Sequence, residues 1–161
     1  MTLLAVVALA AVALGQTKKE FEAFLSVMEP KAAKAFANKD VKFFEGIAAK
    51  EFTYQDHMGK TENLKDSMAG MGQMFGMADK VKMFYKRGAV TLKGSTGTVE
   101  YNSTYHITLK PGPDKKVHVM TVKGKTRETW KKMGATWKVV NITDTAAPEM
   151  LMDGKPVGGG G

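Results

Sequence analysis

The 161-residue chain contains no cysteine. This absence excludes disulfide bonds, a thiol nucleophile and thiolate metal ligands. The chain also lacks a concentrated basic run: its net charge is +8, but the lysines are scattered and no nucleic-acid-binding motif gathers them. We interpret the charge as a solvated basic surface and expect no specific nucleic-acid partner. A composition of 43% hydrophobic and 25% charged residues is typical of one globular domain.

No apolar run is long enough to cross a bilayer. The run from Leu3 to Leu14 is shorter than the roughly 20 residues that a span requires. Small residues at Ala13 and Gly15, followed by polar residues, are typical of a signal-peptidase site. We predict a signal peptide at residues 1–15 and a secreted or periplasmic protein without membrane attachment after cleavage. Because the first two residues supply no basic charge, a misassigned start codon or a cytoplasmic protein with an apolar tail stays open.

Two helices are expected in the next part of the chain. Residues 18–38 carry apolar side chains at spacings of three and four, which is the period of a helix with one buried face. Pro30 interrupts this pattern and predicts a kink or break near Met28 and Glu29. Asp40 is expected to cap a second, shorter helix that ends by Ala49.

A short strand at residues 51–56 and a turn at 57–60 come next. Thr61 is expected to begin and cap a third helix. That helix has methionine at every third position, namely Met68, Met71, Met74 and Met77, so the thioethers spread over a broad arc. Its glycines weaken the helix by roughly 1 kcal/mol each, and we therefore expect a soft, adaptable element.

Strands are expected from residue 80 onward. The β-rich ranges 81–92, 98–109 and 117–132 are separated by turn-forming segments, which predicts an antiparallel meander. Odd-numbered positions in 98–109 are largely apolar, so one face of that strand should be buried. The final arm follows Gly134, and alternation places Trp137, Val139, Asn141 and Thr143 on one of its faces. Residues 146–161 are rich in Pro and Gly, which predicts a flexible tail or an expression scar.

Helices followed by a run of strands indicate an α+β fold. The element order, together with the closing hairpin W-K-K-M-G-A-T-W-K-V-V-N-I-T-D-T, resembles the nuclear transport factor 2-like (NTF2-like) superfamily. Within it, the sequence is most similar to the SnoaL-like and DUF4440 groups, over residues 18–145. The resemblance implies a cone-shaped, curved antiparallel sheet packed on N-terminal helices, a cystatin-like roll. It further implies a domain at 16–145, a pocket on the concave face and a homodimer formed through the sheet.

The resemblance implies little chemistry, because one scaffold carries many functions. Members similar to ketosteroid isomerase combine a carboxylate base near the first short strand, a Tyr on the first helix and a protonated acid on a later strand. Asp56 is the candidate base here, but residues 18–38 contain no Tyr. Other members carry catalytic histidines at positions matched by Asn141 and Thr143, which this chain lacks. Asp56 and His57 are a candidate acid/base pair, but an Asp before a glycine turn is more often a turn residue.

Our leading interpretation is therefore a pocket for a small apolar or amphipathic ligand. The residues expected to contact the ligand are Tyr54, Met71, Met74, Tyr101, Arg127, Trp137 and Asn141. Arg127 is a candidate anchor for an anionic group, although Arg127 and Glu128 also fit an exposed cross-strand set.

Three alternatives stay open. The first is an isomerase or dehydratase with Asp56 as base and Tyr54 or Tyr101 as hydrogen-bond donor, without cofactor or metal. The second is a copper protein that uses the methionine series, since thioethers bind Cu(I), although methionine is also a common flexible filler of apolar walls. The third is an oligomerising module. His106 and His118 lie on neighbouring predicted strands and either approach each other or are solvated.

Overall fold

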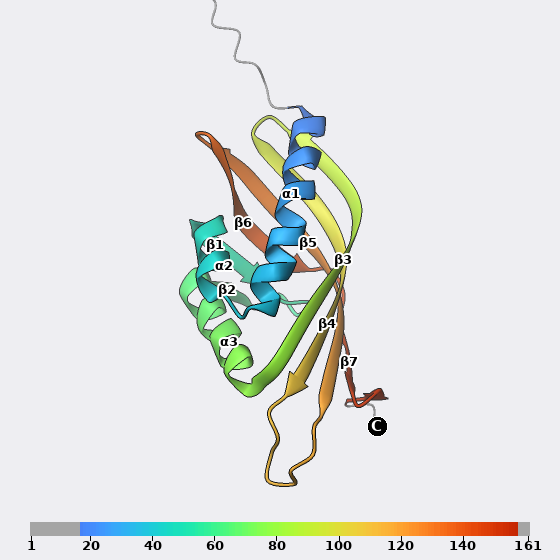
Figure 1. Ribbon diagram of the computed structural model, residues 1–161. Coiled ribbons are helices and arrows are strands. Elements are labelled where there is room, and N and C mark those ends of the chain that lie inside the picture. The colour runs from blue at the N-terminus through green and yellow to red at the C-terminus, as the bar shows by residue number, and fades with distance from the viewer. Residues whose placement is uncertain (1–16, 158–161) are drawn as a thin grey trace, which may run out of the picture.

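The computed structural model describes residues 17–157, so the predicted signal peptide lies outside the described residues. Helices and strands follow one another in an α+β order (Figure 1). The elements are α1 (Lys18–Ala37), α2 (Val41–Ile47), β1 (Ala48–Gln55), β2 (Thr61–Asn63), α3 (Leu64–Met77), β3 (Ala78–Lys93), β4 (Thr96–Leu109), β5 (Val119–Met133), β6 (Thr136–Asp144), β7 (Glu149–Met152) and β8 (Lys155–Pro156). None of the helices within residues 17–157 has the length and apolar character of a membrane span.

The first helix begins at a capping box and continues through its proline. The Glu20 amide donates to Thr17 Oγ1 at 3.2 Å, and the Thr17 amide donates to the Glu20 carboxylate at 2.7 Å. Pro30 lies inside α1 without ending it, so the alternative of a break at this position was wrong. Buried side chains on both sides of the proline, among them Leu25 and Phe36, hold the helix on the sheet and offset the lost hydrogen bond.

Of the other two helices, α2 has the predicted cap and α3 does not. Asp40 caps α2 as expected, because the Phe43 amide donates to Asp40 Oδ1 at 3.1 Å. Helix α3 does not begin at Thr61. Thr61 pairs with Gln55 in the β1–β2 ladder, and Asn63 caps α3 by accepting from the Asp66 amide at 2.9 Å.

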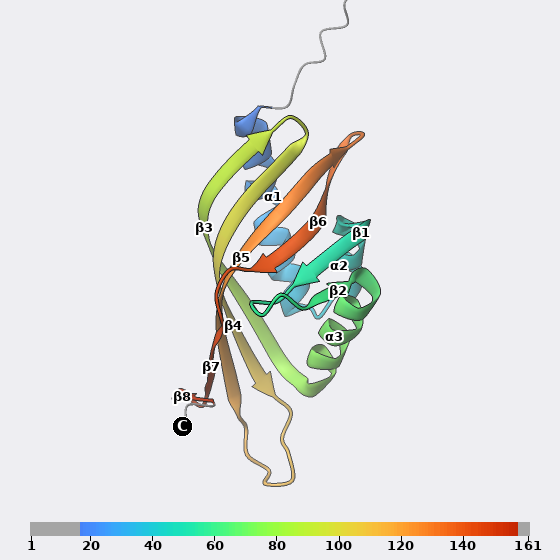
Figure 2. The same cartoon turned by 180° about the vertical axis from the view of Figure 1, so that it is seen from behind.

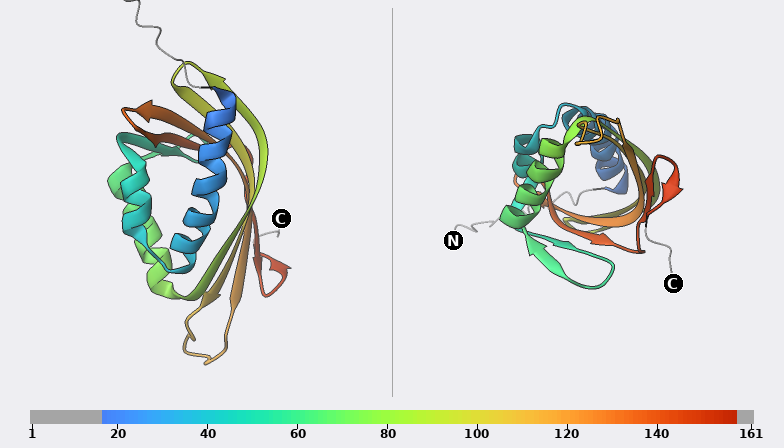
Figure 3. Two further views of the ribbon diagram at one scale, coloured as in Figure 1. Left: turned by 45° about the horizontal axis from the view of Figure 1, so that its top comes forward. Right: turned by 90° about the horizontal axis from the view of Figure 1, so that it is seen from below.

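The sheet has the path β2-β1-β6-β5-β4-β3 (Figure 2). Strands β3 to β6 form the predicted antiparallel meander, whereas β1 joins β6 in parallel. The sheet is strongly curved, and the three helices lie across its concave side (Figure 3). This arrangement confirms the predicted α+β cone, with a mixed rather than purely antiparallel sheet.

Both tryptophans of the closing hairpin are buried against α1. The rings of Phe21 and Trp137 lie 4.6 Å apart between centroids, and those of Phe24 and Trp130 lie 5.2 Å apart. The Phe21 ring rests directly on Gly97 of β4, where an added Cβ would come within 2.4 Å of the ring. A side chain at position 97 would therefore push α1 off this end of the sheet.

A β-bulge in β6 changes which side chains face inward. Trp130 pairs with Val139 and Thr129 with Asn141, so Val140 is an extra residue in the ladder. Trp137 and Val139 are buried, but beyond the bulge Ile142 and Asp144 line the interior. The predicted single face of Trp137, Val139, Asn141 and Thr143 is therefore divided in two.

The segment after β6 contains an ordered hairpin. Strand β7 pairs with β5, and β8 pairs with β7, within the segment for which composition predicts flexibility. The ring nitrogens of His118 form hydrogen bonds with Asp114 Oδ2 at 2.9 Å and Asp153 Oδ2 at 2.7 Å, so His118 links the β4–β5 loop to this hairpin. The two carboxylates raise the pKa of His118. His106 contacts Thr121 at 3.1 Å instead, and the two histidines have separate partners.

Candidate functional site

A cavity of about 510 Å³ lies between the helices and the concave face of the sheet. Its walls are mostly apolar and are supplied by α1, α2, α3 and strands β1 to β6. The methionines in the wall are Met28, Met68, Met71, Met74, Met83 and Met120, and the aromatic residues are Phe36, Phe44, Phe52, Tyr54, Tyr85, Tyr101, Tyr105 and Trp130. This volume and these walls fit a small organic molecule.

The charged residues that line the cavity, among those the structure describes, are all acidic. Glu29, Glu62, Glu128 and Asp144 line the cavity, and among its described lining residues there is no Lys, Arg or His. The interior is therefore acidic in a chain whose net charge is +8.

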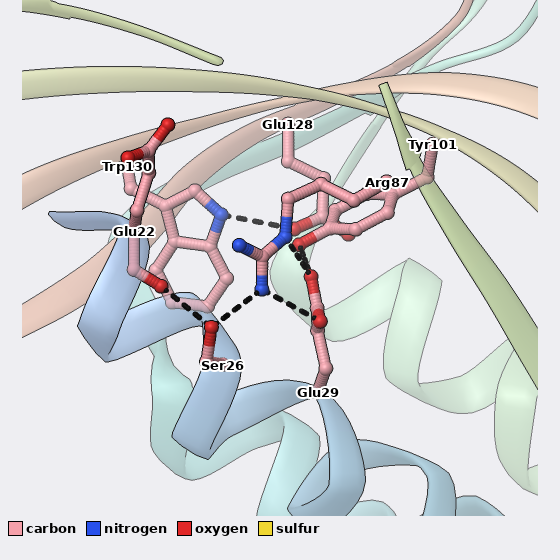
Figure 4. A network of polar contacts seen from close by, with 7 residues as sticks. All are labelled: Glu22, Ser26, Glu29, Arg87, Tyr101, Glu128 and Trp130. Atoms are coloured by element: carbon pink, nitrogen blue, oxygen red, sulfur yellow. Dashed lines mark hydrogen bonds and ion pairs between the residues drawn. The ribbon is translucent and has the colours of Figure 1, made fainter. Parts of the chain in front are cut away.

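Glu29 is held by a polar network at the centre of α1 (Figure 4). Arg87 of β3 forms a two-pronged ion pair with its carboxylate, with N–O distances of 2.7 and 2.8 Å. The Tyr101 hydroxyl donates to the same carboxylate at 2.8 Å, and Ser26 accepts from Arg87 at 3.0 Å. Hydrogen bonding to Glu29 raises the pKa of Arg87. The network fixes the Glu29 carboxylate and neutralises its charge.

Glu128 lies on β5 and lines the same cavity, close to the network around Glu29 (Figure 4). Burial raises its pKa to about 7. A hydrogen bond from the Trp130 indole nitrogen to Glu128 Oε2, at 2.9 Å, opposes this rise, and repulsion from Glu29 adds to it. Within the described residues, Glu128 forms no ion pair. Its carboxyl group can therefore exchange a proton near neutral pH.

A second polar pair lies where β1 and β6 meet. The Tyr54 hydroxyl donates to Asp144 Oδ2 at 2.6 Å, and both residues line the cavity. Burial and this hydrogen bond raise the pKa of Tyr54, so the phenol stays protonated at physiological pH.

The residues predicted to bind a ligand divide into two groups. Tyr54, Met71, Met74 and Tyr101 line the cavity. The other three are outside its lining: Trp137 is buried in the core, Arg127 points outward to Glu100 at 2.8 Å, and Asn141 donates to Thr53. The bulge at Val140 explains the position of Asn141, because it turns that side chain away from the face of Val139.

Asp56 lies in the turn after β1 and is not part of the cavity lining. Its Oδ1 accepts hydrogen bonds from the amides of Met58 and Lys60, each at 2.9 Å. These contacts are those of a turn residue, which was the alternative explanation of Asp56 and His57.

Sequence reasoning missed Glu29 and Glu128, although both had a detectable signal. Glu29 follows Leu25 by four residues and so shares the buried face of α1. Glu128 precedes Trp130 by two residues and so shares the inward face of β5. The interpretation of Arg127 and Glu128 as an exposed set was wrong for Glu128, because adjacent strand residues face opposite sides and the exposed one is Arg127.

The methionine series lies partly in the cavity wall and partly on the surface of the protein. Met68, Met71 and Met74 line the cavity, whereas Met77 is 61% exposed. Among residues 17–157, His, Asp and Glu side chains form no group of three arranged to hold a metal ion.

No protein-family model and no curated protein matches the sequence, but many solved structures match the fold. An NTF2-like superfamily protein from Salmonella enterica serovar Typhimurium superposes with a TM-score of 0.60 at 13% identity, covering 79% of this chain and 88% of that one. The chain has the NTF2-like fold. A candidate dehydratase of the NTF2-like family from Streptomyces avermitilis gives 0.64 at 9% identity, with 80% and 97% covered. A hexachlorocyclohexane dehydrochlorinase, LinA type 2, gives 0.65 at 7% identity, with 88% and 92% covered.

Within this fold the cavity combines three chemical capacities. The methionine and aromatic walls can bury an apolar body. Glu29 and the Tyr54–Asp144 pair supply fixed polar groups, while Glu128 supplies a titratable one. The site is therefore suited to orienting a small molecule and to moving a proton.

Proposed function

We propose that the protein binds a small, mostly apolar molecule in the cavity of its NTF2-like fold. The observation that supports this most strongly is the wall of methionine and aromatic side chains around a space of about 510 Å³. Pockets of this size with apolar walls and few polar groups are typical ligand sites. Methionine adds flexibility, so the wall can adjust to the bound molecule.

The proposal is tested by filling the cavity from the sheet side. Gly124 of β5 lines the cavity, and a Cβ added there meets no atom within 4 Å. Gly124→Leu is therefore expected to occupy ligand space without displacing the backbone. We expect at least ~10-fold weaker binding of 2-naphthylmethanol in calorimetry, because the apolar body loses more than about 1.4 kcal/mol of contact.

Lys125→Leu is the matched control, because the neighbouring position is exposed and alternation places it on the opposite face of the sheet. This variant should bind the alcohol as the unaltered chain does. Equal loss in both variants, or none in Gly124→Leu, would contradict binding in the cavity.

A second candidate is an enzyme that transfers a proton to or from carbon. The structural neighbours described as a candidate dehydratase and a dehydrochlorinase make such chemistry a reasonable expectation, and Glu128 has a pKa of about 7. A base with this pKa is half ionised at neutral pH and so is well matched to proton abstraction. In this candidate, Glu128 replaces Asp56 as the base, because Asp56 is bound within its own turn.

Exchange of the α-protons of 2-tetralone in D₂O tests this second candidate. Glu128 would take a proton from the α-carbon and, after exchange with solvent, return a deuteron. We expect the unaltered protein to accelerate the exchange, Glu128→Gln to lose at least ~100-fold of that acceleration, and Asp56→Asn to keep it. Full exchange activity in Glu128→Gln would remove Glu128 from this role.

Export and cleavage after Gly15 remain part of the proposal as predictions. Mass spectrometry of the protein recovered from the culture medium or periplasm would reveal an N-terminus at Gln16 if they are correct.

A further inference from the structure

The charges inside the cavity suggest which kind of molecule it takes. Its lining includes Glu29, Glu62, Glu128 and Asp144 but, among the described residues, no basic side chain. An anionic ligand would meet repulsion from these groups and would lose its hydration without gaining a partner.

Glu128 is one of two acidic groups in this lining, with Asp144, that form no ion pair among residues 17–157. Glu29 is paired with Arg87, Asp144 accepts from Tyr54, and Glu62 lies 3.6 Å from Lys60 at the surface. From the part of the chain that the structure describes, Glu128 receives a single hydrogen bond, that of the Trp130 indole. An enclosed carboxylate without a cation is costly, and a positively charged ligand would supply the missing partner.

Aromatic rings in the same lining favour the same kind of ligand. Tyr85 and Tyr101 pack with their ring centroids 5.1 Å apart, and Trp130 donates directly to Glu128. Faces of such rings attract cations, more strongly where water is excluded. Carboxylate and rings together are the chemistry that recognises an ammonium group.

We propose that the ligand is an amphipathic organic cation, whose ammonium group binds beside Glu128 while its apolar body lies against the methionine and aromatic walls. This inference rests on the proposed ligand-binding function and specifies it. The net charge of +8 does not oppose it at physiological salt, because surface charges are screened over about 8 Å.

Binding should strengthen as pH rises through 7. Glu128 loses its proton in this range, whereas a primary ammonium group keeps its own to about pH 9. Other charged or titratable groups lie around Glu128 on the neighbouring elements. They are Glu29 on α1, Arg87 and Tyr85 on β3, Tyr101 and Tyr105 on β4, and Asp144 on β6. Burial raises the pKa of each tyrosine, so these phenols do not ionise in this range.

Three probes of one shape test the inference by calorimetry: 2-naphthylmethylamine, 2-naphthylmethanol and 2-naphthoate. At pH 8 the amine should bind at least ~10-fold more tightly than the alcohol, and the carboxylate should bind most weakly. At pH 6 the affinity for the amine should fall ~10-fold while that for the alcohol changes little. These measurements use the unaltered chain and so do not depend on a variant that folds.

Two variants test whether the preference for the amine depends on Glu128. Glu128→Gln should bind amine and alcohol alike at both pH values, while Glu100→Gln, which removes an exposed carboxylate on the outer face, should keep the preference for the amine. Equal binding of all three probes would overturn the inference and leave the proposed ligand binding intact, as would tightest binding of the carboxylate. A preference for the amine that survives in Glu128→Gln would also overturn it. Failure of all three probes to bind would contradict the proposed function as well.

Discussion

The carboxyl group of Glu128 affects stability in a pH-dependent way. Its pKa is about 7 in the folded protein, against an ordinary value of 4.5. Below pH 4.5 the group is protonated in both states. Between pH 4.5 and 7 the unfolded chain releases its proton more readily, so the free energy of unfolding falls as pH rises, and the loss levels off above 7. The shift corresponds to a loss of about 3 kcal/mol at most.

The effect of Glu128→Gln on the free energy of unfolding should therefore depend on pH. Glutamine keeps an acceptor for Trp130 but cannot ionise. At pH 8 we expect the variant to be more stable than the unaltered chain by about 2 kcal/mol, and at pH 4 to lie within about 1 kcal/mol of it. Urea unfolding at the two pH values measures this. The same effect of the substitution at pH 4 and pH 8 would contradict an uncompensated carboxylate at this position.

For single residues, local periodicity predicts which side chains of the site point inward but not which residues they contact. The spacing of α1 and the alternation of β5 are enough to place Glu29 and Glu128 inward once Leu25 and Trp130 are taken as core residues. The contact between Glu29 and Arg87 could not be predicted, because it joins residues 58 positions apart. Such pairings depend on how α1 lies across β3, which a local pattern does not contain.

At the scale of elements, the long periodic segments were predictable and the irregular joints were not. The meander of β3 to β6 follows from alternation and turn composition. The bulge at Val140 does not follow from a fixed alternation, which would place Asn141 beside Val139. The apolar positions change phase from 137 and 139 to 140 and 142, but this change alone does not decide which residue is the extra one. That one residue moves Ile142 and Asp144 to the interior and Asn141 away from it.

Short elements depended on tertiary pairing rather than on composition. Thr61 has the side chain of a helix cap, but its pairing with Gln55 places it in β2 and leaves Asn63 as the cap. Likewise β7 is ordered because Met150 to Met152 complete a ladder with β5. In both cases hydrogen bonds to a distant strand override the local preference.

At the scale of the whole molecule, charge is separated between the interior and the surface. The exposed lysines Lys82, Lys86, Lys125 and Lys131 alternate with inward side chains and so lie on the outer face of the sheet. Four acidic residues, Glu29, Glu62, Glu128 and Asp144, line the cavity on the other side. A homodimer through the sheet stays a prediction, and a two-fold contact there would bring like charges together unless acidic groups or anions intervene.

Methionine methyl NMR tests the central claim most directly, because methionines mark both the cavity and the surface. Titration of methyl-labelled protein with 2-naphthylmethanol should shift the signals of the six cavity residues, Met28, Met68, Met71, Met74, Met83 and Met120. The exposed residues Met58, Met77, Met133 and Met150 should keep theirs. Shifts confined to the exposed residues, or no shifts at saturating probe, would contradict a ligand site inside the cone.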